Sequence, residues 1–127
     1  MARDWWYLQR EKHELFTSQI VLDEIAAGEL EMARRRLKLM ADVSVLALKP
    51  AAEVLADKIL KSGRVPPKAD SDAAHIALAT IHEMDILLTL NCRHIANGTI
   101  AVRLRRLVQA EGYELPAICT PEELLGE

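Results

Sequence analysis

The sequence predicts an α/β domain in which helices cover both faces of a mostly parallel β-sheet. Segments with helical periodicity alternate along the chain with short runs of β-branched and aliphatic residues, an order typical of parallel sheets. The chain has 127 residues, a length that suits one domain, so we expect residues 1–127 to fold as a single unit. Half of the residues are hydrophobic but only 4% are aromatic, which indicates a core of Leu, Ile, Val and Ala.

The first half of the chain supplies helices and strands in alternation. Helices are predicted over residues 2–13, 19–28 and 29–41, and strands over residues 14–18 and 43–48. Ser18 is a suitable N-cap for the second helix, because its hydroxyl can accept a hydrogen bond from an early helical N–H. The third helix is amphipathic, and its period predicts that Met32, Leu37 and Met40 point inward.

The second half continues the same pattern. Helices are predicted over residues 50–63, 72–84 and 99–112 with a terminal turn over 121–127, and strands over residues 85–90 and 115–120. Pro50 suits a first helical turn and Gly63 a helix end. Asp70 or Ser71 is expected to cap the next helix. The strand over 85–90 is almost wholly apolar, as are strands buried on both faces of a parallel sheet.

Charge and cysteine content exclude several classes of protein. The net charge of −3 and the pI of about 5.8 argue against a protein that coats nucleic acid nonspecifically, but they are compatible with a nuclease whose metal-binding acids lower the pI. Cys92 and Cys119 do not form a paired motif, which favours a reducing compartment. No signal peptide and no membrane-spanning run is recognisable, so we expect a cytoplasmic protein without membrane contact.

Polar residues gather where predicted strands end and helices begin. Thr17, Thr89 and Asn91 lie at strand ends, and Asp72 begins a helix. Functional sites of parallel sheets lie at this edge. Carboxylate and amide oxygens suit Mg²⁺ or Mn²⁺, so Glu24, Asp72 and Asn91 form a candidate ligand set, and a bound ion would orient or deprotonate a water for phosphodiester attack. Taken alone, Asp72 has the simpler role of favouring the helix macrodipole.

Three stretches together resemble a known family. They are "DSDAAHIALA…MDILLTLN…HIAN" within residues 70–97, "SQIVLDEIAAGELEMARRRL" from Ser18, and "CTPEELLG" from Cys119. They resemble the PIN-domain family, in particular the VapC-type toxins of bacterial toxin–antitoxin pairs. The resemblance covers nearly the whole chain, and the central stretch is the most specific because several features recur in order.

The resemblance implies a metal-dependent endoribonuclease with a Rossmann-like, three-layer fold and a site for Mg²⁺ or Mn²⁺. By position, Glu24, Asp72 and Asn91 match the family's second, third and fourth acidic or amide ligands. Thr89 matches a supporting threonine, and Asp70 is a neighbouring acid that joins the site or caps the helix. RNA is then the substrate, and an antitoxin protein is a possible partner.

The chain departs from the family at its start. The family opens with a central strand that carries the first acid, whereas here Asp4 lies in a segment that resembles the helix after that strand. Loss of this strand would split the sheet between residues 14–18 and 85–90 and expose two edges. Either the natural chain starts upstream, or the short chain repairs its sheet by dimerising, swapping an element or closing the gap. The alternative function is therefore a catalytically inactive, truncated PIN-like protein that acts as a homodimer or a protein-binding module.

Other polar residues have simpler interpretations. His75 and His82 either orient an acid or, as we favour, are hydrogen-bonded histidines at the edge of the core. Cys92, His94 and Cys119 do not have the spacing of paired zinc ligands. A phosphoacceptor domain is disfavoured, because no predicted strand ends in an Asp with an acid pair close by in the sequence.

Charged and aromatic clusters complete the set of candidates. The arginine clusters at 34–36 and 103–106 can contact phosphate, but a solvated helix face is the favoured reading. Trp5, Trp6 and Tyr7 can stack bases or anchor a dimer, and packing of the first helix on the domain is favoured over base stacking. Asp85 is expected to support the start of its strand.

Overall fold

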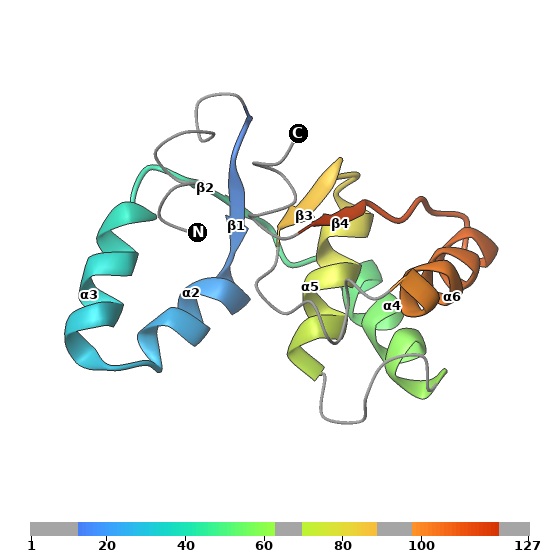
Figure 1. Ribbon diagram of the computed structural model, residues 1–127, viewed down its shortest axis with the longest axis horizontal. Coiled ribbons are helices and arrows are strands. Elements are labelled where there is room, and N and C mark those ends of the chain that lie inside the picture. The colour runs from blue at the N-terminus through green and yellow to red at the C-terminus, as the bar shows by residue number, and fades with distance from the viewer. Residues whose placement is uncertain (1–12, 63–69, 89–97, 120–127) are drawn as a thin grey trace.

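The computed structural model describes residues 13–62, 70–88 and 98–119, and the fold is given for these residues (Figure 1). The helices are α2 (Gln19–Ala26), α3 (Leu30–Leu39), α4 (Pro50–Lys61), α5 (Asp70–Ile81) and α6 (Gly98–Ala110). The strands are β1 (Phe16–Ser18), β2 (Ser44–Leu46), β3 (Ile86–Leu88) and β4 (Ala117–Cys119). The α/β class with short parallel strands is therefore confirmed.

The described strands form two separate parallel pairs. β1 pairs with β2, placing Thr17 opposite Val45, and β3 pairs with β4, placing Leu87 opposite Ile118. Helices α2 and α3 make the first crossover and α6 lies in the second, as parallel strands require. No ladder joins the two pairs within the described part of the chain, so the expected single sheet is not seen there.

Helix α5 is the central element. It contacts α2, α4 and β3, and its residues from Ile76 to Thr80 are all buried. A helix buried on all sides needs small side chains where neighbours approach closely, which accounts for its many alanines. The buried hydroxyl of Thr80 is satisfied, because Thr80 Oγ1 donates to the Ile76 carbonyl at 2.7 Å.

The main hydrophobic core joins α5 to α4 and α6. It consists of Leu55, Ile59, Ala73, Ile76, Ala77 and Leu104, with Leu87 and Ile118 of the second sheet packed against it. Lys58 of α4 also forms an ion pair with Glu111, which directly follows α6. The aliphatic core expected from the composition is thus confirmed, and it lies in the half of the molecule drawn on the right of Figure 1.

The first sheet and its helices are much less buried. α2 has no buried residue, and α3 buries only Ala33. The prediction that Met32 points inward is wrong, because this side chain is 42% exposed, while Leu37 and Met40 are half-buried. Among the described elements, α3 packs mainly on α2, which has no buried residue, and this packing leaves the Met32 side chain exposed.

Local signals set several element boundaries. Ser18 Oγ accepts from the Val21 N–H at 3.2 Å and caps α2 as predicted. The helix predicted over 72–84 instead runs from Asp70 to Ile81 and ends in a turn in which Glu83 has a φ of 56°. β3 is half-buried rather than covered on both faces. The aromatic cluster of the predicted first helix and the terminal turn over 121–127 lie outside the described residues.

The core generates a first prediction. We expect Ile59→Ala to lower the free energy of unfolding by about 3 kcal/mol, because it removes a fully buried side chain and leaves a cavity. Val54→Ala on the same helix is the matched control and should change it by less than about 0.5 kcal/mol, since Val54 is 57% exposed. Urea unfolding followed by circular dichroism measures both. Equal decreases in the free energy of unfolding for the two variants would contradict the burial of Ile59 in the core.

The cap of α3 generates a second prediction, about pH. The Glu29 carboxylate accepts from the N–H groups of Glu31 and Met32, and these backbone hydrogen bonds hold the pKa of Glu29 below its ordinary value of 4.5. A lowered carboxyl pKa stabilises the fold above the ordinary pKa, and this contribution is lost as the pH falls through the folded pKa. The protection of the Glu31 and Met32 amides, relative to the intrinsic exchange rate at each pH, should therefore fall below pH 4.5, and Glu29→Gln should remove this pH dependence. If these amides showed the same pH dependence in Glu29→Gln as in the wild type, Glu29 would not be the cap of α3.

Candidate functional site

The junction between α2 and α5 brings together parts of the predicted site. β1 runs directly into α2, and the Ser18 cap fixes the first turn of that helix at the end of the strand. α2 then packs against α5. The acid predicted on α2 is therefore directed toward the helix that carries the next predicted acid.

A contact between side chains defines this junction. His75 Nε2 of α5 lies 2.6 Å from Glu24 Oε1 of α2, although the two residues are 51 positions apart. The His75 side chain is 17% exposed and that of Glu24 is 50% exposed. An ionised carboxylate only accepts hydrogen bonds, so Nε2 is the protonated nitrogen in this contact. The predicted hydrogen-bonded histidine at the core edge is confirmed, and its partner is one of the predicted metal ligands.

Asp72 lies close to this contact on the same helix. It precedes His75 by three positions, which places the two residues on one face of α5. Asp72 is half-buried in the first turn of the helix. Asp72 therefore shares a face of α5 with the histidine that contacts Glu24.

The other predicted site residues are not placed. Asn91 and Thr89 lie outside the described residues, and for Asp70 only its backbone position at the start of α5 is described. Among the described His, Cys, Asp and Glu residues, no group of three or more is arranged to hold a metal ion. The two acids at the junction supply hard oxygen donors, the kind that Mg²⁺ takes from one or two carboxylates while keeping several waters. Their chemistry therefore fits such an ion.

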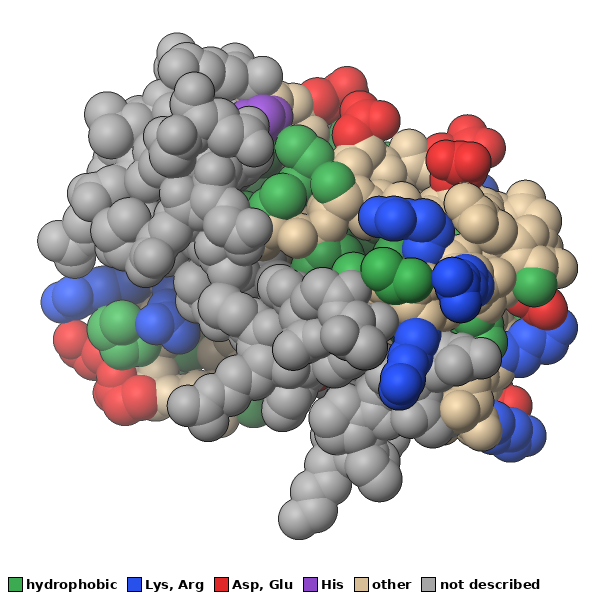
Figure 2. Space-filling model, turned by 45° about the vertical axis from the view of Figure 1, so that its right-hand side comes forward, with side chains coloured by type: hydrophobic (Ala, Val, Ile, Leu, Met, Phe, Trp, Pro, Cys, Tyr) green, Lys and Arg blue, Asp and Glu red, His purple; other side chains and the backbone are tan. Residues whose placement is uncertain are grey.

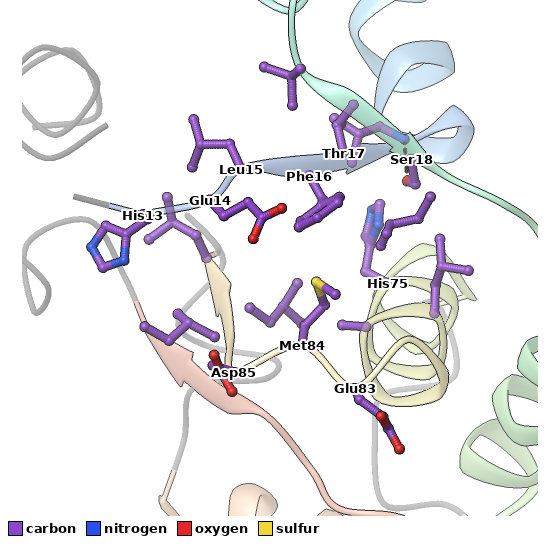
Figure 3. Close-up of a pocket in the computed structure, with 18 of the residues that line it drawn as sticks. His13, Glu14, Leu15, Phe16, Thr17, Ser18, His75, Glu83, Met84 and Asp85 are labelled. Atoms are coloured by element: carbon purple, nitrogen blue, oxygen red, sulfur yellow. Dashed lines mark hydrogen bonds between the residues drawn. The ribbon is translucent and has the colours of Figure 1, made fainter. Parts of the chain in front are cut away.

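A cavity of about 610 Å³ adjoins the junction. Residues 13–18, which lead into and form β1, line one side, and residues 83–88, which lead into and form β3, line the other (Figure 3). Leu78 and Ala79 of α5 line it as well, and so does His75. In Figure 3 the Phe16 ring and the Met84 side chain point into this space. The cavity thus occupies the place where the sheet is split.

Two acids at this cavity were not assigned to a site by the sequence. Glu14 lies just before β1 and Asp85 just before β3, and both line the cavity and are exposed. Figure 3 shows the Glu14 carboxylate directed into the space between the two strands, whereas Glu83 points away from it. The signal in the sequence is an acid one or two positions before a short strand, Asp85 before Ile86 and Glu14 before Phe16. That signal has meaning only when the two strand starts are known to face each other.

The remaining candidates have structural roles or lie at the surface. His82 Nε2 is 2.7 Å from the Ala47 carbonyl oxygen, which links the end of α5 to the segment after β2. The arginines of α3 and α6 are exposed, as expected for solvated helix faces. Figure 2 shows Lys and Arg side chains on the face that α4 and α6 form. Cys119 lies in β4, and the other two members of the rejected zinc set are outside the described residues.

Comparisons with protein-family models, with curated proteins and with solved structures found no match to this chain. The resemblance to the PIN family therefore rests on the stretches quoted above and stays a prediction. Of the helices in the described ranges, none combines the length and the apolar character needed to cross a membrane.

The junction generates a third prediction. A double-mutant cycle with Glu24→Gln and His75→Phe should give a coupling of about 0.5–1 kcal/mol in urea unfolding, because the contact is short and half-buried. The control cycle uses Arg35→Gln and Glu31→Gln. Arg35 Nη2 lies 3.7 Å from Glu31 Oε2, and the two side chains are 75% and 74% exposed. We expect the control cycle to give a coupling near zero. Equal couplings in the two cycles would show that the junction does not hold Glu24.

Proposed function

We propose that this chain is a PIN-type, metal-dependent endoribonuclease and the toxin component of a toxin–antitoxin pair. Glu24, Asp72 and Asn91 are the ligands of Mg²⁺ or Mn²⁺, Thr89 supports the site, and Asp70 is a neighbouring acid. The observation that carries the proposal is the contact between Glu24 and His75. It joins α2 to the face of α5 on which Asp72 lies, so two acids far apart in the sequence share one surface.

The chain's own residues have separable roles in this proposal. When bound, the ion supplies an activated water for phosphodiester attack. Glu24 and Asp72 provide oxygen donors to hold it. His75 restrains the Glu24 carboxylate before the ion arrives, which reduces the conformational freedom lost on binding. The contact is thus a positioning interaction, and His75 itself need not touch RNA.

Positive charge is needed to bring RNA to an acidic site. The chain has a net charge of −3, so attraction must be local. Arg103, Arg105 and Arg106 on α6 are exposed and concentrate positive charge on one helix. Phosphate contacts of this kind bind without sequence preference and weaken as salt rises. Residues other than these arginines would therefore determine which RNA sequence is cleaved.

A second function is favoured by a different observation. Within residues 13–62, 70–88 and 98–119 the strands form two separate pairs, and a cavity of about 610 Å³ lies between them. A PIN-like chain that lacks the strand between them and its acid would be a homodimer or a protein-binding module without catalysis. An antitoxin or another protein is then its partner, and RNA is not its substrate.

Measurements of metal binding and RNA cleavage distinguish the nuclease from the binding module. We expect millimolar Mn²⁺ to raise the melting temperature by about 4 °C or more, because ligand binding to the folded state stabilises it. A fluorescently labelled single-stranded RNA should be cleaved in the same buffer. Glu24→Gln and Asp72→Asn should each remove the thermal shift and lower cleavage by about 100-fold, the loss expected when a ligand to the metal or its support is removed.

Glu53→Gln on α4 is the matched control, because it removes one exposed acid away from the junction. It should leave both the thermal shift and the cleavage rate unchanged. A wild-type chain that shows no shift with Mn²⁺ or Mg²⁺ and leaves the RNA intact would refute the nuclease and favour the binding module.

A further inference from the structure

The two strands that face the cavity each have an unpaired edge within the described residues. β1 pairs only with β2, and β3 pairs only with β4. Each described sheet therefore has two strands of three residues, which is marginal for a sheet on its own. Unpaired strand edges present N–H and C=O groups that readily pair with a further strand.

The cavity between these edges has walls suited to an extended peptide. Phe16 and Met84 point into it, and Leu78 and Ala79 of α5 lie along it (Figure 3). Its volume of about 610 Å³ lies within the range typical of binding pockets, roughly 300–1,000 Å³. Apolar walls beside free backbone groups are the two features used in β-strand addition, where the main chain gives affinity and alternate side chains give specificity.

The negative charge at the cavity favours a ligand that carries positive charge. Glu14 and Asp85 stand at the starts of the two strands, and no Lys or Arg is among the described residues that line the cavity. A strand that pairs with β1 in the parallel sense of the existing pairs has its amino end beside Glu14. A basic residue at that end of the peptide would complement the acids.

We propose that the cavity between β1 and β3 is a docking site for an extended segment of a partner protein. The segment adds a strand parallel to β1, inserts apolar side chains against α5 and Met84, and places Lys or Arg beside Glu14 and Asp85. This proposal rests on the binding-module function given above as the second candidate, and it does not require nuclease activity. It favours a different polypeptide over a second copy, because a second copy joined through these strands would bring its own Glu14 and Asp85 to the interface instead of the basic residue that complements them.

Synthetic peptides test the chemistry of the occupant. The probe is the octapeptide KRVIVLVS with fluorescein at its carboxyl end, titrated with the whole chain and followed by fluorescence anisotropy. We expect a Kd of about 10 μM, in the range of short peptide segments. The peptide EDVIVLVS should bind at least about tenfold more weakly, because its acids face Glu14 and Asp85. The peptide KRVPVLPS should also lose about tenfold or more, because proline has no N–H to donate.

Charge reversal tests the place of binding. The double variant Glu14→Lys, Asp85→Lys should bind EDVIVLVS more tightly than KRVIVLVS, which reverses the preference of the wild type. Glu14→Lys alone should shift the preference in the same direction and serves if the double variant does not fold. Glu53→Lys on α4 makes the same change in charge as Glu14→Lys alone, lies outside the cavity lining, and should keep the wild-type preference.

Amide exchange provides a readout specific for strand pairing. Saturating KRVIVLVS should slow exchange of amides in Phe16–Ser18 at least about tenfold, because the added strand protects the β1 edge. Any one of four results would overturn the proposal. They are no binding at about 1 mM peptide, equal binding of all three peptides, an unchanged preference after charge reversal, and unprotected β1 amides.

Light scattering of the chain without peptide tests whether a second copy of the chain, rather than a separate partner, fills the cavity. A dimer whose β1 amides are already protected and which rejects KRVIVLVS would mean that a second copy fills the cavity. That result would overturn docking of a separate partner while leaving the dimer form of the second function in place. A monomer that binds the basic peptide with the expected preferences supports the proposal.

Discussion

The fold depends on the burial of α5. This helix is enclosed between α4, α2 and β3, and its alanines let neighbouring backbones approach closely. The core cluster joins α5 to α4 and to Leu104 of α6, which contacts α4, and the second sheet packs against that cluster. Because α5 also touches α2, it is the element through which the first sheet is held to the rest of the molecule. A substitution that enlarges α5 at Ala73 or Ala77 would therefore disturb both halves.

The strength of packing is unequal on the two sides of α5. The side of α4 and α6 has fully buried aliphatic side chains, whereas α2 has none and α3 has only Ala33. The first sheet therefore depends on few contacts, and the space between β1 and β3 is a cavity rather than a ladder. Regions with few buried apolar contacts open at low free-energy cost. A further strand between β1 and β3 would add backbone hydrogen bonds and buried apolar area to this weakly packed part of the described structure.

The contact between His75 and Glu24 lies on this weak boundary and relates the two proposed functions to each other. It is a side-chain link between α2 and α5, and it ties Glu24 to the helix that carries Asp72. Metal binding at this junction would draw the two halves together, and a strand in the neighbouring cavity would do the same from the sheet side. Both kinds of ligand would stabilise the folded state by mass action. His75 lines the cavity and contacts Glu24, so the two sites are adjacent rather than independent.

The sequence alone determined the alternation of helices and strands, the aliphatic core and the Ser18 cap, because periodicity and capping are local properties that short segments carry. It also identified Glu24 and Asp72 as acids worth attention, and His75 as hydrogen-bonded. It failed for Met32, because an amphipathic pattern shows which face is apolar but not whether another element covers it. Only the tertiary structure decided that Glu24 meets His75, that the strands form two pairs, and that Glu14 and Asp85 border one cavity. These facts join residues far apart in the chain, and their proximity follows from how the helices pack on α5 rather than from any local pattern.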